Sequence, residues 1–186
     1  MADETSLQKH FLIAMPGLGD SPFGRSVTLL CEHNDDGALG LVINRPTELR
    51  LSTMLDHMEL KHGALADDPI VYWGGPVNPE RGFVIHDAPG EWDSSMQIDE
   101  GLYVTTSRDV LVAMSRGEGP QHYLIALGYA GWGAGQLENE ILHNDWLNTP
   151  VNHSVLFGLP APERWLAATQ LLGLDISHLA SQAGHA

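Results

Sequence analysis

The sequence predicts a single domain of the α+β class, for three reasons. Short apolar runs are separated by clusters of Gly, Pro, Asn and Asp, which is typical of strands joined by tight turns. Helical patterns lie between these runs at irregular intervals, so a doubly wound parallel sheet is not expected. The length of 186 residues fits one domain spanning residues 1–186, with residues 1–6 and 182–186 expected to be frayed.

The predicted strands are mostly antiparallel. The segment between the apolar runs 27–33 and 39–44 is Asn34-Asp35-Asp36-Gly37, which has the composition of a hairpin turn. The 20 glycines of the chain suit many such turns. The other strands are expected at residues 11–15, 71–73, 82–86, 96–98, 102–105, 122–128 and 154–157.

Several short helices are predicted between and after these strands. Leu51, Met54, Leu55 and Met58 recur at i, i+3, i+4 and i+7, which places them on one helical face. Thr106 and Asp109 have the spacing of a capping box at a helix start. The predicted helices cover residues 51–58, 106–116, 136–142, 163–172 and 175–181.

The charge of the chain argues against nucleic acid and anionic membranes as partners. There are 24 acidic and 9 basic side chains, giving a formal net charge of -15. Both nucleic acid and anionic lipid require a basic patch. No apolar stretch reaches the about 20 residues of a membrane helix, and residues 1–9 do not resemble a signal peptide. The cytoplasm is therefore the expected location.

The glycine-rich segment at residues 128–140 is the first candidate for a ligand site. It follows a predicted strand and opens a predicted helix, where backbone N–H groups can hold an anion. The candidate ligand-binding residues are Gly131, Trp132, Gly133 and Gly135. However, the glycine spacing fits neither a P-loop nor a dinucleotide fingerprint, and Glu138 and Glu140 would repel a phosphate. The favoured interpretation is a structural turn with Trp132 buried, in which Gly133→Ala would destabilise the fold by ~1 kcal/mol or more through strain.

Four arginines lie beside small or turn-forming residues: Arg25, Arg45, Arg81 and Arg108. In so acidic a chain, arginines commonly serve as anchors for carboxylates. The alternative hypothesis is that Arg25, Arg45 and Arg81 converge on an anionic ligand near the glycine-rich segment.

Neither a catalytic residue nor a metal or other cofactor is predicted. Cys31 is the sole cysteine, so an internal disulfide is excluded. Its position in an apolar run predicts a small buried side chain rather than a nucleophile paired with His33. No zinc motif is present, nor a nucleophilic-serine motif.

Taken together, several sequence phrases resemble the YqgE/AlgH family. They are FLIAMP (11–16), FGRSV (23–27), CEHN (31–34), GLVINRP (40–46), GGPV (74–77), RGF (81–83), TSRD (106–109) and LGYAGWGAGQLE (127–138). The resemblance implies a bacterial cytosolic protein with an α+β fold of coiled, bifurcated β-sheets. It implies neither an established catalytic activity nor agreed ligand residues. AlgH members carry a label as transcriptional regulators that comes from genetics.

Three functions remain open at this point. The favoured hypothesis is a non-enzymatic regulatory or binding protein that acts through a protein or small-molecule partner. The second is a nucleotide-type binder or enzyme that uses residues 128–138 together with the arginines. The third is a transcriptional regulator that binds DNA directly, against which the net charge of -15 argues.

Overall fold

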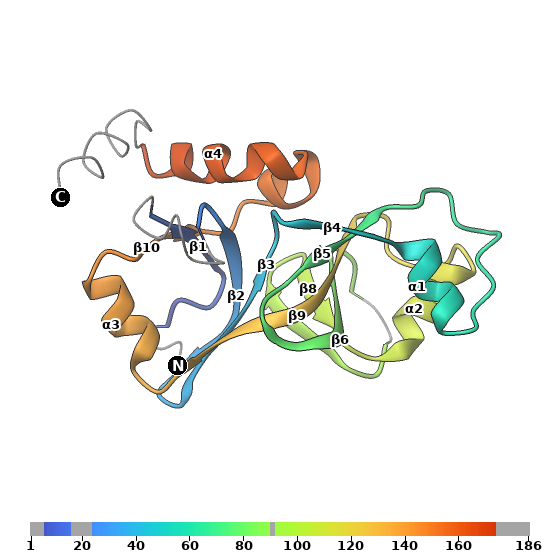
Figure 1. Cartoon of the computed structure of the whole chain (residues 1–186), viewed down its shortest axis with the longest axis horizontal. Helices are drawn as coiled ribbons and strands as arrows, with labels where there is room; N and C mark the ends of the chain where they lie inside the picture. Colours follow the sequence, from blue (N-terminus) through green and yellow to red (C-terminus); the bar gives the residue numbers. More distant parts are fainter. Residues whose placement is uncertain (1–5, 16–23, 90–91, 174–186) are drawn as a thin grey trace. The chain divides into compact units, whose positions relative to one another are not determined.

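The computed structural model describes residues 6–15, 24–89 and 92–173, and Figure 1 shows the chain. The expected frayed ends at residues 1–6 and 182–186 and the predicted helix at 175–181 lie outside these residues, except for Ser6, whose hydroxyl donates to the carbonyl oxygen of His33 at 3.2 Å. The described strands are β1 (His10–Ala14), β2 (Val27–Asn34), β3 (Gly37–Val42), β4 (Pro46–Arg50), β5 (Ile70–Trp73), β6 (Val77–His86), β7 (Ser95–Asp99), β8 (Leu102–Thr105), β9 (Tyr123–Gly133) and β10 (Trp146–Pro150). The described helices are α1 (Leu51–His57), α2 (Arg108–Ser115), α3 (Gln136–Leu142) and α4 (Ala161–Leu171), with a π-helical turn, η2 (Ser154–Gly158).

The fold is α+β, as predicted, and the chain divides into two compact units. Unit 1 contains the chain up to Arg45 and from Ala130 onward, and unit 2 contains Pro46–Tyr129. Strand β9 therefore contributes its first part to unit 2 and its last residues to unit 1. None of the helices described is long and apolar enough to cross a bilayer.

Unit 1 is built on an antiparallel sheet in the order β10-β1-β2-β3, with the end of β9 beside β3. The predicted hairpin joins β2 to β3, and the Asn34 side chain accepts a hydrogen bond from the Asp36 N–H at 2.8 Å. Gly37 closes this hairpin at φ 138°, and a Cβ there would lie 2.2 Å from the Trp132 carbonyl oxygen. A glycine is therefore required at this position.

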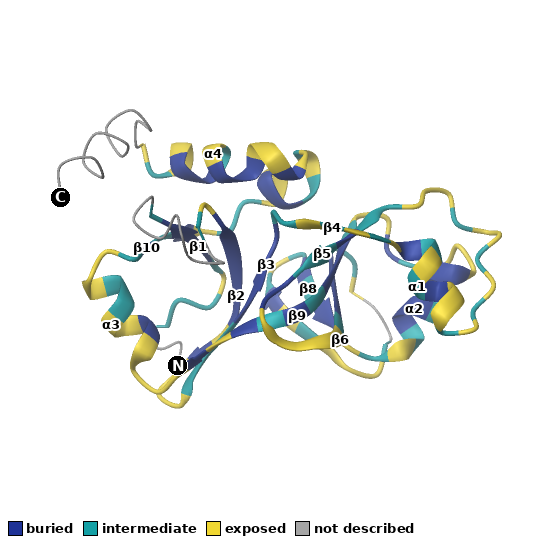
Figure 2. Cartoon of the chain, viewed as in Figure 1, coloured by how far each residue is buried: buried dark blue, intermediate teal, exposed yellow. Residues whose placement is uncertain are grey.

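Helix α4 packs on unit 1 through one face. Figure 2 shows buried residues along one side of α4 and exposed residues along the other. The Trp165 Nε1–H donates to the carbonyl oxygen of Ala14 at 3.1 Å, and Arg164 donates to the carbonyl oxygen of Ile43. These bonds satisfy backbone acceptors that would otherwise be costly to bury.

Unit 2 places its strands in the order β4-β5-β9-β6-β8-β7, in which the β5–β9 pair is parallel and the other pairs are antiparallel. Helices α1 and α2 share one apolar core with the sheet. The predicted helical face is confirmed, because Leu51 and Leu55 are fully buried while Met54 and Met58 pack against the same core.

Several predicted elements differ from those in the structure. Residues 154–157 form the turn η2 rather than a strand, because so short an apolar run has no period that separates helix from strand. The strand expected to end at residue 128 continues to Gly133, since residues 130–133 pair with β3. Strands β4 and β10, which lack an apolar run, were not predicted.

Candidate functional site

The glycine-rich segment is a strand end and not an open loop. Gly131 pairs with Leu39 and Trp132 pairs with Ala38 in the ladder between β9 and β3. The Gly133 N–H donates to the Gln136 Oε1 at 2.9 Å. The turn itself is confined to residues 134–135, where Gly135 precedes α3 with φ 73°. Within residues 128–140 a positive φ is found at Gly128 and at Gly135.

Strain at Gly133, in contrast, is not found. Gly133 is not among the residues with positive φ, and a Cβ there would approach only Gln136, at 3.8 Å. This is an ordinary van der Waals distance, so the predicted cost of Gly133→Ala is wrong. The spacing of the glycines in the sequence does not show which of them turns the chain.

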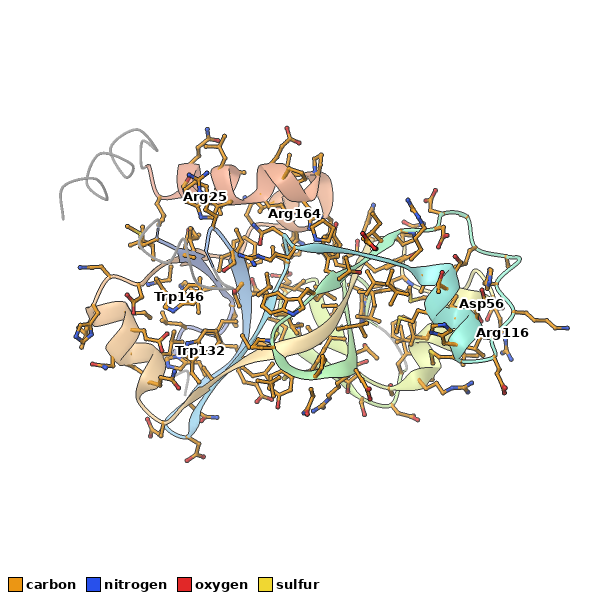
Figure 3. All side chains as sticks on the ribbon, in the orientation of Figure 1. Arg25, Asp56, Arg116, Trp132, Trp146 and Arg164 are labelled. Carbon is orange, nitrogen blue, oxygen red and sulfur yellow. The ribbon has the colours of Figure 1, made fainter. Side chains whose placement is uncertain are left out.

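Trp132 is buried, as the structural interpretation predicted. Its side chain is 7% exposed, and its Nε1–H donates to Glu140 Oε1 at 3.2 Å. The Nε1–H of Trp146 donates to the same oxygen at 3.0 Å, and Gln136 donates to the other carboxylate oxygen at 2.9 Å. The two indole rings meet edge to face at 5.9 Å (Figure 3). Side chains of β9, β10 and α3 therefore bond to one another at the end of this segment.

The three candidate arginines each have a local partner. The Arg25 guanidinium lies 5.3 Å from the centre of the Trp165 ring, and Arg45 donates to the carbonyl oxygen of Gly24 at 2.6 Å. Arg81 belongs to unit 2, where its guanidinium lies 5.3 Å from the Phe83 ring centre. The contacts found in the described part of the chain do not join these arginines into one anion site.

Cys31 is buried in β2, as predicted, and is 1% exposed. Burial, with a smaller contribution from Glu32, strongly raises the pKa of its thiol. His33 is committed elsewhere, because its Nδ1 accepts the Leu7 N–H at 2.8 Å and its Nε2 therefore carries the proton donated to Glu138. This bond from His33 lowers the pKa of Glu138. A thiol with a raised pKa beside an engaged imidazole is poorly suited to nucleophilic catalysis.

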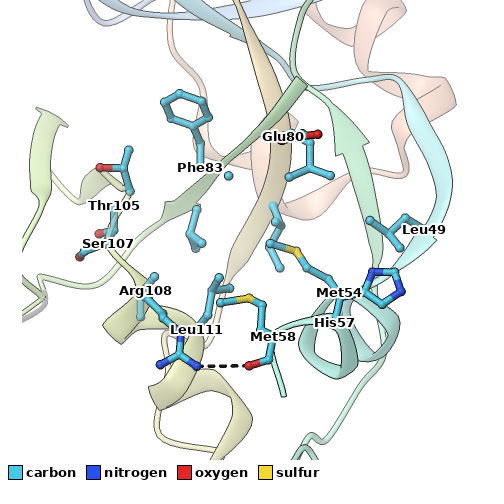
Figure 4. A pocket seen from close by; sticks show the side chains of 16 residues that line it. Leu49, Met54, His57, Met58, Glu80, Phe83, Thr105, Ser107, Arg108 and Leu111 are labelled. Carbon is cyan, nitrogen blue, oxygen red and sulfur yellow. Dashed lines mark hydrogen bonds between the residues drawn. The ribbon is translucent and has the colours of Figure 1, made fainter. Parts of the chain in front are cut away.

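An apolar pocket of about 410 Å³ lies in unit 2. Its walls come from the segment around α1, from β6, from the start of α2 and from β9 (Figure 4). The apolar lining residues are Leu49, Met54, Met58, Phe83, Val84, Val110, Leu111, Ile125 and Leu127. The remaining lining residues are His57, Glu80, Gly82, Thr105, Thr106, Ser107 and Arg108. Among the residues described, no group of three His, Cys, Asp or Glu side chains could hold a metal ion.

Gly82 on β6 helps to keep this pocket open. A Cβ at Gly82 would lie 3.5 Å from the Met54 Cε and 3.8 Å from the Leu127 Cδ2. These distances leave room for one methyl group, and a larger side chain would extend toward Met54. A glycine here therefore leaves volume that another residue would fill.

Carboxylates fix the elements around the pocket. Asp68 accepts hydrogen bonds from the Ser52 N–H at 2.8 Å and the Ser52 hydroxyl at 2.6 Å at the start of α1, and these bonds lower its pKa. Asp109 in α2 accepts from the Ser107 hydroxyl at 2.5 Å and the Asp93 N–H at 2.8 Å. Burial tends to raise the pKa of Asp109, but these hydrogen bonds outweigh it and the pKa is lowered.

Sequence reasoning missed the pocket although its signals were present. The phrases RGF at 81–83 and TSRD at 106–109 both supply lining residues, and Arg108 was one of the four arginines noted. Met54 and Met58 were assigned only to the core. Apolar residues that line a cavity have the same helical spacing as those that fill a core, so the pattern does not separate the two.

Mostly antiparallel strands, short helices and a partly open, mainly apolar pocket in unit 2 characterise a small α+β protein. The chain belongs to the AlgH-like family, whose profile matches residues 11–177. This confirms the family resemblance found in the sequence.

Relatives of known sequence and structure agree with this assignment. The chain is 54% identical to a UPF0301 protein of Thioalkalivibrio sulfidiphilus over the full length of both. It is 57% identical to one of Methylococcus capsulatus over 96% of each. The solution structure of the AlgH protein from Pseudomonas aeruginosa is similar at a TM-score of 0.81 and 46% identity, covering 100% of this chain and 99% of that one. That likeness confirms a single α+β domain with a curled antiparallel sheet and short helices.

A more distant likeness concerns the fold alone. The crystal structure of protein DIP2367 from Corynebacterium diphtheriae has a TM-score of 0.68 and 19% identity, covering 89% of this chain and 86% of that one. The fold is therefore found in proteins whose sequences have diverged widely.

Proposed function

We propose that this chain is a non-enzymatic cytoplasmic binding protein that holds a small, mainly apolar molecule in the pocket of unit 2. The observation that supports this most strongly is the cavity of about 410 Å³ between α1, α2, β6 and β9. Sites for small molecules typically measure about 300–1,000 Å³, with apolar walls and a few polar groups. Any regulatory effect of the protein would follow from occupation of this pocket.

The lining of the pocket favours an apolar ligand body. The side chains of Met54 and Met58 line it without filling it. Apolar surface area that is removed from water contributes about 25 cal/mol per Å². Flexible methionines also adapt to ligands of different shape.

The polar groups at the pocket do not form a catalytic set. The Ser107 hydroxyl donates to Asp109 and accepts the Ser94 N–H at 3.0 Å. The Thr105 hydroxyl is bonded to His86 and to Ser95, at 2.7 Å in each case. Hydroxyls engaged in this way favour a binding role over nucleophilic catalysis.

Direct DNA binding is not favoured as the route to regulation. The net charge of -15 opposes contact with phosphates. We therefore place the small molecule, and through it a protein partner, ahead of nucleic acid. A gel shift at physiological salt is expected to give no sequence-specific complex with duplex DNA, and a sub-micromolar specific complex would contradict this.

Methionine methyl NMR with decanol as a neutral apolar probe tests the proposed function. Decanol is expected to shift the ε-methyl signals of Met54 and Met58, which line the pocket, and to leave that of Met96 on β7 unchanged. Gly82→Val should weaken the response, because the larger side chain takes up part of the cavity beside Met54. Gly63→Val is the matched control, since a Cβ at Gly63 meets no atom within 4 Å. A response that is absent in the wild type, or equal in both variants, would refute the proposal.

A further inference from the structure

We propose that the ligand of this pocket is an amphipathic carboxylate whose charged group is bound by Arg108. This proposal rests on the proposed function, since it names the chemical class of the molecule that the pocket holds. It follows from the position and unused hydrogen-bonding capacity of Arg108 and from the distribution of charge around the pocket.

At the edge of the pocket, Arg108 uses one of its guanidinium N–H donors in a hydrogen bond to the protein. The side chain lines the pocket and is exposed. One of its Nη2–H groups donates to the carbonyl oxygen of Met58 at 3.2 Å (Figure 4). A guanidinium carries five N–H donors in a planar fork, so several remain for a ligand.

The ion pairs of the described residues do not include the Arg108 guanidinium. Within the described residues, the ion pairs join His33 to Glu138, His62 to Asp56 and His122 to Asp87, and Arg108 is in none of them. The adjacent Asp109 is engaged by Ser107 and Asp93. The Arg108 guanidinium charge is therefore available at the edge of the pocket.

A carboxylate would compete well for Arg108. The present partner, the Met58 carbonyl, is neutral and single. A carboxylate accepts two parallel N–H bonds from guanidinium, and bonds between charged groups are about twice as strong as neutral ones. Binding can therefore proceed by exchange of one weak bond for a stronger pair.

The charges around the pocket also set the direction of the ligand. In Figure 4 the Arg108 guanidinium lies beside Met58, whereas Glu80 lies at the opposite end of the cavity. Glu80 repels a carboxylate from its own end, so the charged group is directed to Arg108 and the apolar body to the interior. The start of α2 offers no competing anion site, because Asp109 already accepts its N–H groups.

Three probes of equal chain length separate this inference from the proposed function: decanoate, decanol and decylammonium, each titrated against the Met54 and Met58 methyl signals. Decanoate should bind about tenfold more tightly than decanol, as expected for a hydrogen-bonded charge pair. Decylammonium should bind most weakly. Arg108→Gln should remove the preference for decanoate over decanol, whereas Arg116→Gln, at the exposed C-terminal end of α2, should keep it.

Each outcome has a distinct meaning. If none of the three probes binds, the proposed function fails. If decanol and decanoate bind equally, or decylammonium binds most tightly, the pocket stands and the carboxylate inference is overturned. A preference for decanoate that survives in a folded Arg108→Gln variant also overturns it. Should that variant not fold, Arg108→Lys must weaken the preference, because lysine lacks the planar fork, and an undiminished preference refutes the role of Arg108.

Discussion

The end of β9 in unit 1 and the pocket of unit 2 are two places where strands, glycines and helices lie together, and they differ in what fills them. At the end of β9, Trp132 and Trp146 both donate to Glu140, and their indole rings pack edge to face. In unit 2, Gly82 faces Met54 across open volume. A glycine thus turns the chain at Gly135, whereas the glycine at Gly82 leaves room beside Met54 in the pocket lining. The surrounding side chains, rather than the glycine, distinguish the two roles.

Among the substitutions considered, loss of a buried tryptophan should have the largest effect on the free energy of unfolding. Trp132→Ala should lower the free energy of unfolding by about 3–5 kcal/mol, because it removes a buried ring and leaves a cavity. Urea denaturation measures this change. A loss below about 1 kcal/mol would indicate that Trp132 is not part of a tightly packed core.

Gly133 at the end of β9 and Gly135 in the following turn are a matched pair of positions in unit 1. Gly135→Ala should destabilise the fold by about 1–2 kcal/mol, since the residue has φ 73°. Gly133→Ala should change stability by less than about 0.5 kcal/mol, since its Cβ would meet only Gln136 at 3.8 Å. Thermal unfolding of the matched pair decides this, and equal losses in both variants would contradict it.

A smaller effect concerns the carboxylates that hold the pocket elements. The pKa values of Asp68 and Asp109 are lowered in the fold. A carboxyl with a depressed pKa stabilises the fold above its unfolded pKa of about 4, and this contribution is lost as the pH falls through the folded value. Stability should therefore decline with acid below about pH 4. Asp109→Asn should make the decline of stability with falling pH shallower, and adding Asp68→Asn should make it shallower still. Urea unfolding at a series of pH values measures this decline. If stability falls with pH as steeply in the variants as in the wild type, the two carboxylates do not have this role.

Much of the fold could be predicted from the sequence, because its signals are local. The hairpin at 34–37 follows from Asx and glycine chemistry, and the face of α1 follows from the spacing of Leu51 and Leu55. Strand β10 has no local sequence signal of this kind. All five of its residues pair with β1, and this long-range pairing specifies the strand. Cys31 was placed correctly because an apolar strand buries a small side chain whichever sheet it joins.

The candidate site was less predictable for a related reason. The glycine and tryptophan residues of the glycine-rich segment indicate a candidate ligand loop in the sequence. Its closure depends on Glu140 reaching two indole N–H groups, which is a tertiary fact. The pocket depends on Gly82, Met54 and Arg108, which come from separate elements, and no local pattern reveals that they converge.

The location of a bound apolar molecule tests the central claim most directly. Intermolecular NOEs from decanol to the methyl groups of Met54 and Met58 would place the ligand in the pocket of unit 2. We expect these NOEs, no NOE to the Trp132 indole, and weaker NOEs in Gly82→Val. NOEs to Trp132 in place of the two methionines would contradict this expectation.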